Sequence, residues 1–244
     1  MFAGQNIIVF DVETLRSAED CLHCGQDVGR HGLGRACPGG VSVTATGWTF
    51  QPIGWREHPT ALGLSIGCYF DYQDMTYHFF DQQCLCATLQ AWVDRQAYLV
   101  SFNGVSFDGP LLCALVHDAV DVEPLPLTSL CEAFTCLLHH GYDILAQIWQ
   151  TDPDRKFERG LNSLDTLSQA NGYGAKPMDG AQAPRRWAQG HYAAVIEYCR
   201  GDVEKTRRLF EQIVTQGTLL RGDGLPLRLP PPSFPWASPQ GVTP

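Results

Sequence analysis

The sequence predicts an α/β domain in which a mixed sheet is flanked by helices. Three features predict this class. Strand-like segments dominate the first half, helical spacing dominates the second half, and a strand-helix-strand element lies between them. The chain has 244 residues, of which 44% are hydrophobic and 18% charged, so it can bury a sizeable core. We expect one domain over residues 1–220, followed by a Pro-rich tail over residues 221–244.

The expected strands lie early in the chain. Residues 7–10 form a wholly apolar run that leads into Asp11-Val12-Glu13, as in a buried central strand with acidic residues at its carboxyl end. Residues 62–70 and 75–80 are separated by turn-like residues and predict a hairpin. Residues 98–102 predict a further strand, which ends at the turn residues Asn103-Gly104.

The expected helices follow from spacing and from proline. Residues 85–93 have helical spacing, and a helix should begin at Gly109 or Pro110 and run to about residue 116, because proline is favoured at a first helical position. Further helices are expected over residues 127–139, 144–150, 161–170 and about 192–216. The second half of the chain is therefore mainly helical.

A Gly- and Cys-rich insert over residues 16 to about 54 interrupts the path from the first strand to the second. Within it Cys21, Cys24, His31 and Cys37 follow the pattern C-x₂-C-x₆-H-x₅-C, which suits a tetrahedral structural zinc site. His23 competes with His31 as the fourth ligand. The alternative is a flexible loop whose thiols bind nothing.

The composition also narrows the class of protein. The start of the chain has no basic segment before its apolar run, and Asp11 follows only four apolar positions, so we expect neither a signal peptide nor a membrane helix, and a soluble, cytoplasmic protein with reduced cysteines. A net charge of −9 argues against a protein that coats nucleic acid through a general basic field. It is compatible with an enzyme that holds a strand end through bound metal ions.

Three segments offer carboxylates that can converge. Asp11 and Glu13 are two residues apart on a strand and share one face. Tyr198 and Asp202 are four apart on a predicted helix and also share a face. Asp108 lies between a strand and a helix, where functional groups are common. Such oxygen ligands suit two Mg²⁺ or Mn²⁺ ions, which can stabilise both ends of a phosphodiester displacement.

These segments resemble a known family. Residues 10–14 (FDVET), 101–108 (SFNGVSFD) and 198–203 (YCRGDV) are similar to the three exonuclease motifs of the DEDD superfamily, which has a ribonuclease H-like fold with a mixed five-stranded sheet. Residues 160–165 (GLNSLD) and Lys176 extend the resemblance to predicted ribonuclease H-like exonucleases of bacteria and phages. The histidine branch has a His where this chain has Glu197, so Tyr198 indicates the tyrosine branch, as in polymerase proofreading domains.

The resemblance implies a 3′→5′ exonuclease in which Asp11, Glu13, Asp108 and Asp202 hold two metal ions and Tyr198 orients the attacking water. It also implies that Thr14 and Leu15 touch the terminal nucleotide and that Asn103 and Phe107 line the strand path. The expected substrate is nucleic acid with a free 3′ end, with single-stranded DNA preferred to RNA.

Alternatives stay open from the sequence alone. They are an exoribonuclease with the same chemistry and a catalytically silent nucleic-acid-binding or adaptor module, and a polymerase or helicase partner is compatible with any of them. Arg185-Arg186-Trp187 can be interpreted as a contact to a phosphate backbone and a base, but the sequence favours a solvated loop with one buried Trp.

Overall fold

The computed structural model describes residues 2–23, 43–44, 47–48, 52–118, 127–156, 158 and 160–236. Its main sheet has five strands in the order β5-β4-β1-β6-β7. They are β1 (Ile7–Thr14), β4 (Leu64–Asp71), β5 (Thr76–Phe80), β6 (Tyr98–Ser101) and β7 (Tyr142–Asp143). β1 is antiparallel to β4 and parallel to β6. The expected mixed five-stranded sheet flanked by helices is therefore confirmed.

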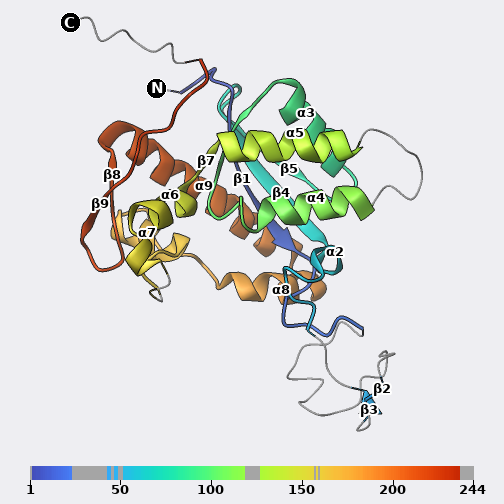
Figure 1. The fold of residues 1–244 in the computed structure, drawn as a ribbon. Helices are drawn as coiled ribbons and strands as arrows, with labels where there is room; N and C mark the ends of the chain where they lie inside the picture. The colour runs from blue at the N-terminus through green and yellow to red at the C-terminus, as the bar shows by residue number, and fades with distance from the viewer. Residues whose placement is uncertain are drawn as a thin grey trace, which may run out of the picture.

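Helices cover both faces of this sheet (Figure 1). α3 (Leu85–Asp94), α4 (Asp108–Asp118) and α5 (Leu127–His140) lie on one face. The long helix α9 (Tyr192–Gln216) lies on the other face, together with α6 (Ile144–Thr151) and α7 (Leu164–Ala170). Side chains of β1 alternate between the two apolar cores: Ile8 and Phe10 join the α3–α5 side, and Ile7 and Val9 join the α9 side. The unbroken apolar run of β1 follows from this burial on both faces.

Several short elements were not expected from the sequence. They are α2 (Pro59–Leu62), η1 (Pro153–Arg155), η2 (Gly180–Gln182), α8 (Ala183–Ala188) and strand β7. α7 begins at Leu164, later than predicted, because the Ser163 hydroxyl accepts a hydrogen bond of 3.1 Å from the backbone amide of Thr166 and so caps the helix.

Residues 221–236 pack on the domain, which corrects the predicted boundary between the domain and a Pro-rich tail at residue 220. β8 (Thr218–Leu220) and β9 (Pro226–Arg228) form an antiparallel hairpin, and Leu227 and Leu229 are buried in the core on the α9 side. The buried guanidinium of Arg221 pairs with Asp152. Phe234 lies against Phe2 and Tyr98, with ring centroids 6.4 and 5.0 Å away. Prolines gave this segment a tail-like composition, but its apolar residues bind it to the domain.

The two ends of the Cys-rich insert meet beside the end of β1. The amide of Ile53 donates to the carbonyl of Asp20 at 2.9 Å, and Cys21 and Pro52 form an isolated antiparallel bridge. Between residues 24 and 51 the structure describes only the backbone pair β2 (Val43–Thr44) and β3 (Gly47–Trp48). In the described part of the chain, no helix has both the length and the apolar composition needed to cross a membrane.

Candidate active site

The strand β1 brings two carboxylates to the α9 side of the sheet. Odd-numbered residues of β1 face α9, so Asp11 and Glu13 continue the row that starts with Ile7 and Val9. The Ser65 hydroxyl donates to the carbonyl of Glu13 at 2.9 Å, next to an irregularity in the pairing of β1 with β4. Both acidic side chains therefore project from a rigid central strand toward the helix that faces it.

Helix α9 supplies the facing side chains. Tyr198 and Asp202 are only 2% and 3% exposed and lie one turn apart on the face that packs against β1. Lys176 binds both of them: its Nζ donates to the Tyr198 hydroxyl at 3.0 Å and to Oδ2 of Asp202 at 2.5 Å. The second carboxylate oxygen of Asp202, Oδ1, is buried and has no hydrogen-bond partner among the described residues.

Asp108 reaches the site from the first turn of α4, and it is 4% exposed. The loop before it is held by Asp143, which the sequence did not single out. Asp143 accepts hydrogen bonds from the amides of Asn103 and Val105 at 3.1 and 2.9 Å, and it also caps α6 through the amide of Ala146 at 3.0 Å. The only signal for Asp143 in the sequence is an acidic residue just before a predicted helix.

The site accumulates negative charge in a buried place. Burial, followed by the charge of Asp202, raises the pKa of Asp11 to about 8. Burial, followed by the charge of Asp11, raises the pKa values of Glu13 and Asp108 well above their usual range. Lys176 opposes part of this effect for Asp11 and Glu13. Without a further cation, some of these carboxyl groups must therefore hold protons near neutral pH.

Cys199 is a hydrogen-bond donor in this site. Its Sγ lies within 4.8 Å of carboxylate oxygens of Asp11 and Glu13, and it donates to the carbonyl of Asp11 at 3.5 Å. Burial, followed by the charges of Asp11 and Glu13, raises the pKa of this thiol well above its usual range. A protonated thiol is a poor ligand for hard cations, so the oxygen atoms remain the ligands that suit Mg²⁺ or Mn²⁺.

The donor set fits divalent cations of this kind. It offers oxygen ligands from three separate segments, an excess of buried negative charge, and one buried carboxylate oxygen of Asp202 that lacks a partner. No protein-family model and no curated protein matches this chain. The case for a metal site therefore rests on the burial, charge and hydrogen bonds of these side chains.

The four predicted substrate contacts take different places. Thr14 and Leu15 lie just after the carboxylates, where the Thr14 hydroxyl donates to the carbonyl of Arg16 at 2.8 Å and Leu15 is 39% exposed. Asn103 has a positive φ of 73° and shapes the turn before Asp108. Phe107 packs edge-on against Trp55, 5.8 Å between ring centroids, at the border of the α3–α5 core. Of the four, Leu15 is the side chain most open to a ligand.

The predicted zinc ligands are described only at one end. Cys21 is buried at the start of the insert. Cys24, His31 and Cys37 lie outside the described residues. His23, the alternative to His31 as fourth ligand, is described and half-buried.

A hollow of about 590 Å³ lies beside the carboxylates. Lys176, Gly180 and Tyr198 are among the residues that line it. Gly180 belongs to η2, and a Cβ atom at this position would come within 3.0 Å of the Tyr198 hydroxyl. A glycine here therefore keeps the hydroxyl accessible from the hollow.

Proposed function

We propose that this protein is a metal-dependent 3′→5′ exonuclease with a ribonuclease H-like fold. The observation that carries the proposal is the convergence of five side chains from three segments on one end of β1: Asp11, Glu13, Asp108, Tyr198 and Asp202. The strand order and the helices on both faces are compatible with this fold. The resemblance of the three motifs supplies the direction of degradation.

Asp11, Glu13, Asp108 and Asp202 would hold two Mg²⁺ or Mn²⁺ ions. Bound there, the ions would lower the pKa of a water molecule and stabilise charge on the leaving oxygen of a phosphodiester. Burial is the first cause of the raised pKa values of Asp11, Glu13 and Asp108, and repulsion between neighbouring carboxylates is the second. A divalent cation would relieve that repulsion, in competition with protons.

Tyr198 would orient the attacking water as a neutral phenol. Burial, followed by the charges of Asp202 and Glu13, raises its pKa far above its ordinary value, so it keeps its proton at neutral pH. Its oxygen already accepts a hydrogen bond from Lys176, and its own proton is directed to the Asp202 carboxylate in the ion-free site. With Asp202 bound to a metal ion, that proton could be donated to a water or a phosphate oxygen. Lys176 thus positions both Tyr198 and Asp202.

Single-stranded DNA is the preferred substrate in this proposal, because the motifs resemble those of proofreading domains. An exoribonuclease would use the same groups. A silent adaptor module would have no chemical use for the complete set of buried carboxylates. We further infer that the insert binds one structural zinc ion through Cys21, Cys24, His31 and Cys37.

The test is degradation of 5′-labelled single-stranded DNA, RNA and duplex in the presence of Mg²⁺, Mn²⁺ or a chelator. We expect a ladder that shortens from the 3′ end, is fastest on single-stranded DNA, and is abolished by the chelator. Asp108→Asn should lose activity while its melting temperature stays close to that of the wild type. Asp94→Asn is the matched control, because Asp94 is an exposed residue on α3.

Activity of Asp108→Asn at the wild-type rate would contradict the assignment of the site. Absence of cleavage with every polymer and either metal would contradict the enzyme itself and favour the adaptor.

A further inference from the structure

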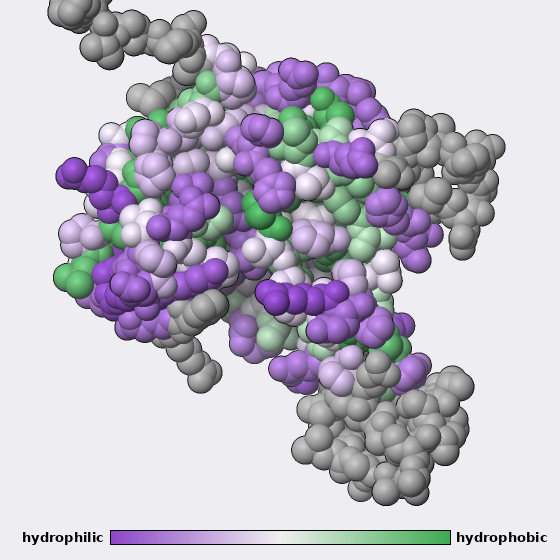
Figure 2. All heavy atoms as spheres, in the orientation of Figure 1, coloured by the Kyte–Doolittle hydropathy of each residue, from purple (hydrophilic) through white to green (hydrophobic). Residues whose placement is uncertain are grey.

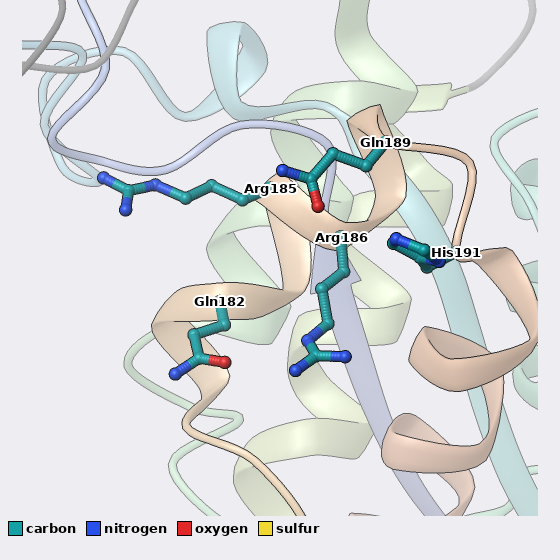
Figure 3. Close-up of a pocket in the computed structure, with 5 residues that line it drawn as sticks. All are labelled: Gln182, Arg185, Arg186, Gln189 and His191. Carbon is teal, nitrogen blue, oxygen red and sulfur yellow. The ribbon is translucent and has the colours of Figure 1, made fainter.

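Helix α8 carries a basic hollow close to the candidate active site. Gln182, Arg185, Arg186, Gln189 and His191 line a cavity of about 430 Å³ on the surface (Figure 3). Figure 3 shows Gln182 and Arg186 extending in the same direction, while Arg185 points to another side of the helix. Strongly hydrophilic atoms cover the position of α8 on the surface in Figure 2. On a chain with a net charge of −9, the guanidinium group of Arg186 in this hollow creates a local site for anions.

The backbone under these arginines is fixed, which corrects the expectation of a solvated loop. Ala183 and Pro184 are buried on the inner side of α8, and the helix packs against both β1 and α9. Trp187 lies edge-on against Tyr192, 4.8 Å between ring centroids. The outer side of α8 therefore presents its polar groups from a rigid base, which lowers the entropy lost when a ligand binds.

Arg186 differs from most arginines of the described chain in its surroundings. Arg155, Arg200 and Arg207, for example, each pair with a glutamate at 2.9 Å or less. Arg186 is half-buried and makes no ion pair with any residue that the structure describes. Its planar guanidinium can therefore bind a phosphate through two parallel hydrogen bonds without first breaking an internal pair.

The chain itself links this hollow to the candidate active site. η2 has Gly180 at one end, beside the Tyr198 hydroxyl, and Gln182 at the other end, in the basic hollow. From Gly180 to Arg186 the chain advances by roughly 10 Å, as three residues of 3₁₀ helix followed by three of α-helix. A fully stacked strand rises by about 3.4 Å per nucleotide, so this distance corresponds to at most about three nucleotides, and to fewer in an extended strand.

We propose that the hollow on α8 binds a backbone phosphate of single-stranded nucleic acid, a few nucleotides from the 3′ end that enters the carboxylate site. This rests on the proposed function for its location relative to the substrate end. Arg186 is the main ligand, and the amide of Gln182, which extends in the same direction, donates to the same phosphate. Contact with the backbone rather than a base predicts affinity without sequence preference.

The test separates binding from cleavage. Fluorescence anisotropy with a 5′-labelled oligothymidylate, in chelator and at several salt concentrations, reports binding alone. Arg186→Gln should weaken binding by about tenfold, as expected for loss of one charge-assisted contact. It should also reduce the slope of log K against log salt by about 0.7. In cleavage assays the same variant should raise KM with little change in kcat.

Arg228→Gln is the matched control, because it removes one positive charge from an exposed position on β9, and it should leave all three measurements near wild type. Arg186→Lys should recover the salt slope but not the full affinity, since an ammonium group lacks the planar fork. Equal binding by Arg186→Gln and Arg228→Gln would overturn the proposal, even if the protein cleaves. Binding that depends on Arg186 in a protein that does not cleave would support the hollow and contradict the exonuclease. Equally strong competition by a polyglutamate peptide would indicate a protein ligand and overturn the nucleic-acid assignment.

Discussion

Metal affinity should depend steeply on pH, because protons and divalent cations compete for the same carboxylates. The pKa of Asp11 is raised to about 8, so below that pH a cation must displace its proton. One displaced proton changes log K by one for each pH unit. Between pH 6 and pH 8 the affinity for Mn²⁺ should therefore rise by up to about 100-fold, or about 2.7 kcal/mol. The raised pKa values of Glu13 and Asp108 act in the same direction and steepen the dependence.

The metal-free protein should show the opposite trend in stability. The pKa of Asp11 is about 8 in the folded protein, against an ordinary value of 3.8 in the unfolded chain. Its protonation therefore stabilises the fold fully below pH 3.8, and this stability is lost as the pH rises to about 8. The metal-free melting temperature should thus fall between pH 5 and pH 8. Added Mn²⁺ should restore more of the loss at pH 8 than at pH 6.

The assay is isothermal titration calorimetry with Mn²⁺ at several pH values, in two buffers of different ionisation enthalpy, which counts the protons released. Asp11→Asn should release about one proton fewer and show a flatter pH dependence. Asp94→Asn should match the wild type. An affinity that stays constant between pH 6 and pH 8, with no proton release, would refute the electrostatic reasoning.

Three further predictions concern single groups. Tyr198→Phe should lower kcat while the calorimetric affinity for Mn²⁺ stays near wild type, and a loss of metal binding would contradict its role toward water. Asp143→Ala leaves the part-buried amides of Asn103 and Val105 and the cap of α6 without a partner. This loss should cost about 3 kcal/mol and lower the melting temperature by roughly 6–12 °C in calorimetry. An unchanged melting temperature would show that the loop does not depend on Asp143. Elemental analysis should find about one zinc ion per chain. The zinc should be lost in Cys21→Ser and kept in the control Cys84→Ser, which changes an exposed cysteine. Protein that contains no zinc after expression in zinc-supplemented medium would contradict the zinc site.

Long elements with strong patterns were predictable from the sequence. The apolar run of β1 needs burial on both faces, which predicted it as the central strand. The helical spacing over about residues 192–216 predicted the long helix α9. The carboxylates of β1 and α9 were predictable as a group, because period two on a strand and a four-residue step on a helix each place two residues on one face.

Short and long-range features were not predictable in the same way. β7 has two residues and α8 has six, too few for a period to emerge. Asp143 accepts hydrogen bonds from backbone amides about 40 residues earlier in the chain. A local sequence pattern cannot predict such a long-range contact. The packing of Leu227, Leu229 and Phe234 was not predicted, because the neighbouring prolines gave the segment the composition of a tail. A high proline content indicates a stiff segment, but it does not indicate which surface that segment packs against.

The contact between Phe2 and Phe234 bears on how the protein can be handled. These rings lie near the start of β1, whereas Glu13 lies near its end, about 20 Å away at the rise of a β-strand (Figure 1). A fluorophore or surface anchor attached beside Phe2 or Phe234 would thus sit at the end of β1 opposite the carboxylates. In the proposed exonuclease, a molecule held at this end would keep the carboxylate end of β1 clear of the surface, which suits an assay that follows the shortening of one strand.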